Sequence, residues 1–196
     1  MIGRLQGTLL TKQPPQILVD VNGIGYEVDV PMSTIYDLPA VGEKVTLHTH
    51  LAVREDAQQL FGFLTLQERA LFRDLIKVSG VGGKVALAIL SGISVSEFVL
   101  CVQSNDVTRL TKVPGIGKKT AERLIVEMRD RLDGKGFSGA VSGGVPVGAD
   151  PVSEAHSALV ALGYKPAEAS RMLDKVAAAD MGSEALIRAA LKAVAG

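Results

Sequence analysis

Two short glycine–lysine stretches contain the residue types and spacing in this sequence that could do chemistry. One runs from Ser79 to Lys84 and the other from Pro114 to Lys119, and a shift of 35 residues superposes them. Glycines at alternate positions permit positive φ angles and let a ligand approach the backbone closely. The unpaired N–H groups at the start of a following helix, together with the helix dipole, favour an anion. The sequence therefore predicts two anion-binding turns.

The predicted anion is a nucleic-acid phosphate. The patterns GxxxxGK[ST] and GxGxxG are both absent, which argues against a nucleotide triphosphate or a dinucleotide as the ligand. No aromatic stripe accompanies the turns, which argues against stacking on single-stranded bases. Backbone donors to phosphates do not read base sequence, so we predict sequence-independent duplex contacts. The candidate DNA-binding residues are Ser79, Gly80, Val81, Gly82, Gly83, Lys84, Pro114, Gly115, Ile116, Gly117, Lys118, Lys119 and Arg123.

Helices must flank each turn if its N–H groups are to be presented in this way. Apolar residues at helical spacing do so around the first turn, namely Leu71, Phe72, Leu75, Ile76, Val85, Leu87, Ile89 and Leu90. The same residues would also fit two ordinary helical hairpins whose glycines only cap helices. Repetition of the glycine pair and the lysine at one period favours the anion site.

Positive charge gathers on this repeat, although the formal net charge of the chain is zero. Residues 1–64 hold 4 basic and 7 acidic residues, whereas residues 65–132 hold 11 basic and 7 acidic residues. Such segregation is typical of a local DNA-binding surface. The excess is modest, so charge alone does not establish the function.

The composition predicts a soluble protein of the cytoplasm. No apolar run approaches the roughly 20 residues that a membrane helix needs, and the N-terminus lacks the apolar core of a signal peptide. Cys101 is the only cysteine, which excludes an internal disulfide and suggests a reducing compartment. It lies in an apolar stretch, so we expect a buried, inert thiol.

Residues 1–64 are predicted to form a small β-barrel. Apolar residues alternate with polar ones on both sides of Asn22-Gly23, a strong hairpin signal. The predicted strands centre on residues 17–21, 26–30, 45–49 and 60–63. An oligonucleotide/oligosaccharide-binding (OB) barrel and an SH3-like barrel both fit this pattern. Between the last two strands, Glu55 and Asp56 suggest a solvated hairpin tip.

The remaining residues are predicted to form a linker and a small helical unit. Residues 133–150 contain six glycines and little to pack, which indicates a flexible linker. Residues 151–196 are predicted to form three short helices, with breaks at Gly163 and at Gly182-Ser183. A tethered unit of this size, marginal in stability, suits a docking module.

The sequence resembles the RuvA family over essentially its whole length. VPGIGKKTAERLI (residues 113–125) is similar to the signature of helix-hairpin-helix proteins, which hold DNA by its backbone. MIGRLQG at the start and REDA at residues 54–57 also match this family. The resemblance implies an α+β, multidomain chain. Its parts would be an OB barrel (1–64), a tandem helix-hairpin-helix domain (65–132), a linker (133–150) and a three-helix, UBA-like bundle (151–196).

The family resemblance also implies a function and a set of partners. RuvA binds Holliday junctions in the RuvAB branch-migration complex, so junction DNA, a RuvB-like ATPase, a RuvC-like resolvase and a homotetramer or double tetramer are expected. Glu55 and Asp56 would form an acidic pin that repels phosphates. Leu162, Gly163 and Tyr164 are candidate motor-binding residues, although they would equally suit the bundle's core. No catalytic residue, metal or cofactor is expected, and hydrolysis would belong to the partner.

Two other functions compete with this interpretation. A helix-hairpin-helix DNA glycosylase would use a lysine at the place of Lys119 as its nucleophile, with a downstream aspartate across a base-flipping pocket. Here Asp130 and Asp133 lie at the end of a helix and the start of the linker, which disfavours that pocket. The second alternative is a scaffold without a DNA role, which binding measurements on junction and duplex DNA would distinguish.

Overall fold

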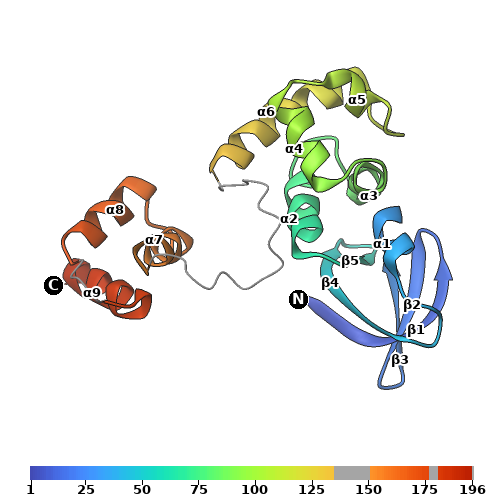
Figure 1. Cartoon of the computed structure of the whole chain (residues 1–196), viewed down its shortest axis with the longest axis horizontal. Coiled ribbons are helices and arrows are strands. Elements are labelled where there is room, and N and C mark those ends of the chain that lie inside the picture. The colour runs from blue at the N-terminus through green and yellow to red at the C-terminus, as the bar shows by residue number, and fades with distance from the viewer. Residues whose placement is uncertain (135–150, 177–180, 196) are drawn as a thin grey trace. The chain divides into compact units, whose positions relative to one another are not determined.

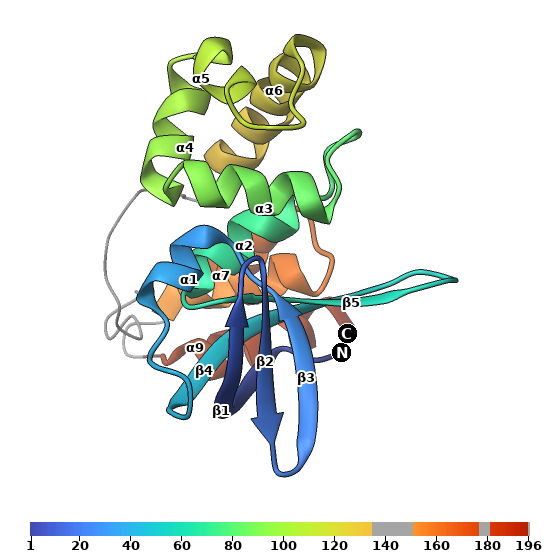
Figure 2. The same ribbon diagram turned by 90° about the vertical axis from the view of Figure 1, so that its right-hand side faces the viewer.

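The computed structural model describes residues 1–134, 151–176 and 181–195, and Figures 1 and 2 show it as a ribbon. The chain divides into two compact units, Met1–Ala140 and Val141–Gly196. The first unit contains both the strands and the glycine–lysine turns. Mixed strands and helices confirm the predicted α+β class.

The segment predicted to be a linker, residues 133–150, falls almost wholly outside the described residues. Its start is the exception, because the last helix of the first unit, α6 (Lys118–Gly134), continues into it. For residues 135–150 the linker stays a prediction.

A closed barrel opens the first unit, as the sequence predicted. Within the described residues 1–134 it has five strands in the order β1-β2-β3-β5-β4. The strands are β1 (Arg4–Gln13), β2 (Gln16–Val21), β3 (Ile24–Asp29), β4 (Lys44–Val53) and β5 (Gln58–Phe63). Alternation places Ile17, Val19 and Val28 inside, with no exposed surface. The first strand, β1, is missing from the sequence prediction because its threonines and glycine obscure the alternation.

The Asn22-Gly23 turn forms the predicted hairpin between β2 and β3. Asn22 has φ of 53° and Gly23 has φ of 89°, the positive pair that a tight two-residue hairpin turn requires. The Gly23 N–H donates to Asp20 Oδ1 at 3.0 Å, which fixes the turn further. This local chemistry is why the hairpin between β2 and β3 is predictable from sequence.

Besides β1, a helix in the barrel segment was not predicted. Helix α1 (Met32–Asp37) follows β3 and buries Thr34 and Ile35. Six residues are too few to display a helical period, so this helix is not predictable from the pattern of apolar residues. The Met32 N–H donates to Ser91 Oγ at 2.9 Å, which ties the barrel segment to the helices that follow.

The rest of the first unit is helical. Its helices are α2 (Leu66–Leu75), α3 (Gly83–Gly92), α4 (Val95–Gln103), α5 (Val107–Thr111) and α6. Thr65 caps α2 by accepting from the Glu68 N–H, and Ser94 with Glu97 forms a full capping box on α4. The helices share one apolar core around Phe72, Ile89 and Leu124.

Aromatic contacts join the barrel to the helices. Phe61 and Phe63 of β5 lie with ring centroids 4.7 Å and 5.0 Å from that of Phe72 in α2. All three rings are buried, and both β5 phenylalanines belong to the helical core. Tightly packed aromatic contacts of this kind resist relative motion. The barrel and the glycine turns are therefore held as one body.

The second unit is a small helical bundle. In its described residues it contains α7 (Pro151–Ala161), α8 (Pro166–Asp174) and α9 (Ser183–Ala195). Gly163 ends α7 in the left-handed region, with φ of 102°. The Gly163 N–H donates to the Val160 carbonyl, and the Tyr164 N–H donates to the Leu159 carbonyl, as in a Schellman cap.

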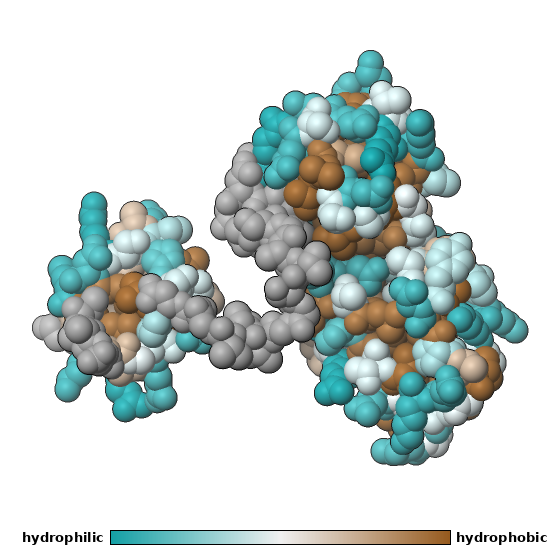
Figure 3. All heavy atoms as spheres, viewed as in Figure 1, coloured by the Kyte–Doolittle hydropathy of each residue, from teal (hydrophilic) through white to brown (hydrophobic). Residues whose placement is uncertain are grey.

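Hydrophilic side chains are interspersed with apolar ones over the visible surface of both units (Figure 3). Among the described helices none alone has the length and hydropathy of a membrane span. Only α3 and α4 together reach them, and these two are bent by 97° at their break.

Candidate nucleic-acid interface

The two glycine–lysine turns have the same backbone geometry. Gly80 has φ of 88° and Gly115 has φ of 87°. In each turn the next N–H, from Val81 or Ile116, donates to the carbonyl three residues earlier, at 3.0 Å and 3.1 Å. The repeat in the sequence is therefore a repeat in structure, with a left-handed residue at the same place in both copies.

The side chains of Val81 and Ile116 point into the core. They are 4% and 5% exposed, although both were candidate DNA-binding residues. Only their backbone is left to face a ligand. Ser79 and Pro114, at the start of each turn, are exposed.

The second glycine of each turn is not required by the fold. Gly82 caps α3 with φ of −89° and ψ of 176°, an extended conformation that any residue adopts. A Cβ added at Gly82 or at Gly117 would meet no atom within 4 Å. The carbonyls of these two glycines accept from Ala86 and Ala121, so each glycine stands at the start of its helix. An open helix N-terminus without a side chain suits close approach by an anion.

Gly83 has a different role from the glycine before it. A Cβ at this position would lie 2.5 Å from Cζ of Phe61, a contact that real side chains do not make. Its small size lets the first turn of α3 rest directly on the β5 aromatic ring. Packing therefore explains why this residue is a glycine, and DNA binding by its backbone stays a prediction.

The two turns lie near each other within the first unit. A Cβ on Gly115 would be 3.5 Å from Cγ2 of Val85, which belongs to the first copy of the repeat. Nη1 of Arg123, in α6, donates to the Ser79 carbonyl at 3.4 Å. The second copy therefore packs on the first at the turns themselves.

Exposed cations accompany both turns. The side chains of Lys84, Lys118, Lys119 and Arg123 are exposed. The two copies differ in the residues just before the turns. In the first copy, Lys77 Nζ forms an ion pair with Asp74 Oδ1 at 3.0 Å. In the second copy, Lys112 corresponds to Lys77, and Arg109 stands in the place of that aspartate. The second turn is thus the more electropositive one. Sequence alone does not reveal this difference, because the two lysines superpose and only the structure shows which of them is neutralised.

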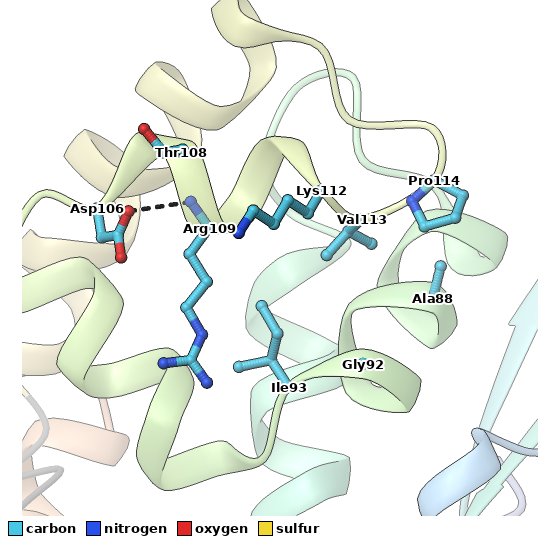
Figure 4. A pocket seen from close by; sticks show the side chains of 9 residues that line it. All are labelled: Ala88, Gly92, Ile93, Asp106, Thr108, Arg109, Lys112, Val113 and Pro114. Atoms are coloured by element: carbon cyan, nitrogen blue, oxygen red, sulfur yellow. Dashed lines mark hydrogen bonds between the residues drawn. The ribbon is translucent and has the colours of Figure 1, made fainter.

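A hollow of about 510 Å³ beside the second turn contains this extra charge (Figure 4). Arg109 and Lys112 enter it from one wall, and Ile93 and Val113 form apolar surface. Asp106 accepts from the Arg109 N–H at 2.9 Å and so begins α5.

The Arg109 guanidinium forms an ion pair with Glu97. Hydrogen bonds from Ser94, and then the contact with Arg109, lower the pKa of Glu97 to about 2. This pair leaves Lys112 as the cation of the hollow that has no ion-pair partner among the described residues.

The acidic hairpin tip lies between β4 and β5. Its turn closes through the Arg54 N–H, which donates to the Ala57 carbonyl at 2.8 Å, and Glu55 and Asp56 are both exposed. Figure 2 shows this hairpin projecting from the barrel to the same side as the turn between α2 and α3. The acidic hairpin and the first glycine turn therefore project to one side of the first unit.

The geometry of α6 disfavours the glycosylase interpretation. Lys119 is in the first turn of this helix, whereas Asp130 lies 11 residues further along it. At 1.5 Å per residue their backbones are about 17 Å apart. Such a separation along one helix disfavours a base pocket shared by a lysine nucleophile and this aspartate.

The histidines and the cysteine do not form a reactive site. In the described part of the chain no three His, Cys, Asp or Glu side chains are grouped to hold a metal. Cys101 is buried, and burial raises the pKa of its thiol, which disfavours the reactive thiolate. His48 and His50 lie on β4 beside arginines, and desolvation with that positive charge lowers the pKa of both.

This histidine environment predicts acid sensitivity. Burial comes first among the causes, followed by Arg69 and Arg4 for His48 and by Arg73 and Arg69 for His50. The unfolded chain therefore binds more protons at mildly acid pH, and stability should fall as the pH drops below about 6.5. Thermal unfolding between pH 7.5 and 5 would measure this loss. Replacing both histidines with glutamine should reduce the loss of stability at acid pH. If the variant kept the parent's pH profile of stability, His48 and His50 would not be the cause of the acid sensitivity.

The left-handed glycines should be more sensitive to substitution than the capping ones. Alanine at Gly80 or Gly115 is expected to destabilise the first unit by about 1–2 kcal/mol, because a Cβ strains this conformation. Serine at Gly82 should change stability by only a few tenths of a kcal/mol, since it remains a good helix cap. Urea denaturation followed by circular dichroism would compare the three variants. An equal loss of stability in all three variants would be inconsistent with a left-handed backbone at Gly80 and Gly115 and an extended one at Gly82.

In the second unit, the candidate partner-binding residues differ in exposure. Leu162 is 62% exposed, whereas Tyr164 packs against the core of the bundle. Gly163 forms the cap described above. Of these three candidates, the leucine is therefore the one that presents a large apolar side chain to solvent.

Comparison with known proteins gives matches along the chain. The RuvA N terminal domain matches residues 1–62, the SAM-like helix-hairpin-helix tandem matches residues 72–130, and the RuvA C-terminal domain matches residues 150–195. These ranges cover the barrel, the paired turns and the second unit.

Full-length relatives carry the same family name. The chain is 60% identical to a protein of Thioalkalivibrio sulfidiphilus over 198 residues, which cover 98% of both chains. It is 57% identical to one of Vibrio cholerae (99% of this chain, 100% of the relative) and 60% identical to one of Halorhodospira halophila (98% and 97%). Each of these relatives is named Holliday junction branch migration complex subunit RuvA. The chain belongs to the RuvA family.

Proposed function

We propose that this protein binds four-way (Holliday) junction DNA by its structure rather than its sequence and recruits a separate ATPase for branch migration. Its full-length relatives are named as subunits of the Holliday junction branch migration complex. The observation that carries the proposal is the pair of matching turns, each with a left-handed glycine and an open, glycine-capped helix start. The role is that of a DNA-binding subunit in recombination and repair, and the enzyme of the complex is the motor chain.

Each turn would hold one phosphate of the DNA backbone. N–H groups at the starts of α3 and α6 would donate to the phosphate oxygens, and Lys84, Lys118, Lys119 and Arg123 would add charge. Arg123 would exchange the Ser79 carbonyl, its acceptor at 3.4 Å, for a phosphate. Lys112 joins this set, because it lies beside the second turn without a partner among the described residues.

The acidic hairpin would supply selectivity for branched DNA. Glu55 and Asp56 are exposed, and the β4–β5 hairpin that carries them projects to the same side as the first turn (Figure 2). A continuous duplex on the turns would bring its phosphates to these carboxylates, and like charges across an interface cost several kcal/mol. A junction avoids that cost, because its strands part at the centre.

The assembly extends the proposal beyond the DNA. We expect four copies around one junction, or two such tetramers, with a RuvC-like resolvase acting on the same DNA in the cytoplasm. The second unit would dock the RuvB-like motor through Leu162 and the adjoining Gly163-Tyr164. The proposed division is 1–64, 65–132, 133–150 and 151–196, and the matched ranges 1–62, 72–130 and 150–195 support it.

Binding measured on three DNAs tests the function. Fluorescence anisotropy with a four-way junction, a linear duplex of the same arm sequence and a single strand should rank them in that order. Affinity should fall steeply as salt rises, because phosphate contacts release counterions. A junction of scrambled sequence is the control and should bind equally well. Equal affinity for all three DNAs would refute structure-selective binding.

A further inference from the structure

A carboxylate of the barrel lies near the start of α3. Asp29 is the last residue of β3, and its partner in the strand register is Phe61 of β5. The Phe61 ring supports the first turn of α3, because a Cβ at Gly83 would lie 2.5 Å from its Cζ. Lys84, the first cation of that helix, follows Gly83 directly. The end of β3 and the first lysine of α3 are therefore neighbours across one aromatic ring, and Figure 2 shows α3 over the end of the barrel at which β3 finishes.

The Asp29 side chain points away from the barrel core and interacts with Lys84. Val28 and Val30 on either side of it have no exposed surface, so alternation turns Asp29 outward, where it is half-buried. Burial raises the pKa of Asp29, and the positive charge of Lys84 opposes that increase. Glu27, two residues earlier on the same face of the strand, adds to the increase. The ammonium and the carboxylate are thus close enough for each to affect the charge of the other.

Lys84 is not locked to this carboxylate. Its side chain is exposed, and it forms no ion pair with any carboxylate in the described part of the chain. An ammonium on a flexible four-carbon stem can turn toward Asp29 or toward a phosphate on the first turn. The carboxylate and the phosphate therefore compete for one cation.

The second turn has two lysines where the first has one. Lys119 corresponds to Lys84, and Lys118 stands where the first copy has Gly83. Both are exposed, and neither is in an ion pair with a carboxylate of residues 1–134. A lysine could not replace Gly83, because the Phe61 ring fills the space that its Cβ would need. The packing that joins β5 to α3 thus keeps a second lysine out of the first turn.

We infer that Asp29 weakens phosphate binding at the first turn by competing for Lys84, so that the two turns hold DNA unequally. The inference rests on the proposed function and names a residue that sets the strength of one of its two phosphate sites. When Lys84 turns to Asp29, Arg123 is the proposed DNA contact that stays beside the first turn, through its bond to the Ser79 carbonyl. The second turn then carries the larger share of the affinity.

Neutralising Asp29 tests this inference. Asp29→Asn keeps the size of the side chain and should raise the affinity for junction DNA by about threefold to fivefold, the effect of one exposed ion pair. The slope of log affinity against log salt should become steeper by about one, because Lys84 gains a phosphate contact. Fluorescence anisotropy over a series of salt concentrations would measure both. Glu27→Gln removes the same charge from the same face of β3 and is the control, for which affinity and slope should equal those of the parent.

A double-mutant cycle shows whether Asp29 acts through Lys84. Asp29→Asn should give no gain in a Lys84→Gln protein, whereas the gain should persist in a Lys119→Gln protein. Thermal unfolding checks that each variant is folded. Folded Asp29→Asn protein with the parent's affinity, or an equal gain with and without Lys84, would overturn the inference, since the carboxylate would then act only through the overall field. Either result with junction-selective binding intact leaves the proposed function standing, whereas a parent protein that does not select junctions refutes that function itself.

Discussion

Aspartate at both Gly82 and Gly117 is expected to abolish junction binding while leaving the first unit as stable as the parent protein, or more so. Both glycines start a helix, and a Cβ at either position meets no atom within 4 Å. Aspartate is a better helix cap than glycine by a few tenths of a kcal/mol, and its charge favours the helix dipole. The two substitutions should therefore not lower the free energy of unfolding of the first unit.

Phosphate binding should respond in the opposite way. The new carboxylate would occupy the place of the anion and accept the N–H groups that the phosphate needs. Repulsion of several kcal/mol at each turn predicts at least about a tenfold loss of affinity for one substitution and more than about 100-fold for both. Anisotropy on junction DNA and urea denaturation, measured on the same preparations, would give the two results.

A matched control exists in the second unit. Gly182 also precedes a helix, its carbonyl accepts from the Leu186 N–H at 3.1 Å, and a Cβ there meets nothing within 4 Å. Gly182→Asp makes the same chemical change away from the turns, so DNA affinity should be unaltered. Retained junction binding in the double turn variant would show that the helix starts are not the phosphate sites.

The repeat was predictable from sequence because local chemistry specifies it. Gly80 and Gly115 must be glycine to adopt φ near +88°, and the N-terminal capping residues follow from helix chemistry. Because the two turns superpose at a shift of 35 residues, they are recognisable as two copies of one repeat. The hairpin at Asn22-Gly23 was predictable for the same reason, since its turn type depends on two adjacent residues.

Features that depend on distant contacts were not predictable. Gly83 resembles its neighbours in sequence, and only the Phe61 ring 2.5 Å from its would-be Cβ reveals a packing role. Lys77 and Lys112 superpose in the repeat, but the residue three positions earlier neutralises one and not the other. Arg4 of β1 lies opposite His48 of β4, and Arg69 of α2 donates to the Gly3 carbonyl beside them, a grouping that no local pattern predicts.

Removing the charge of the acidic hairpin should increase affinity for continuous duplex and so reduce selectivity. Glu55 and Asp56 are exposed at a turn that the Arg54–Ala57 backbone hydrogen bond closes, so Glu55→Gln with Asp56→Asn keeps the shape. We expect about a tenfold gain in duplex affinity, which corresponds to about 1.4 kcal/mol of relieved repulsion. Lysine at both positions should give a larger gain, and junction affinity should stay equal to that of the parent or rise.

Branch migration distinguishes the hairpin's role from a general charge effect. The pair Asp37→Asn and Glu43→Gln removes the same charge from exposed sites on the barrel segment outside this hairpin. If the hairpin separates strands at the crossover, only the Glu55 and Asp56 variants should change the rate of motor-driven migration on a synthetic junction. A collapse of junction binding in those variants would mean that the carboxylates hold the DNA, for instance through a cation, rather than repel it. If the Glu55/Asp56 variant and the Asp37/Glu43 variant gave equal rates of branch migration, the hairpin would have no specific role in strand separation. Its charge would then act only through the overall electrostatic field of the protein.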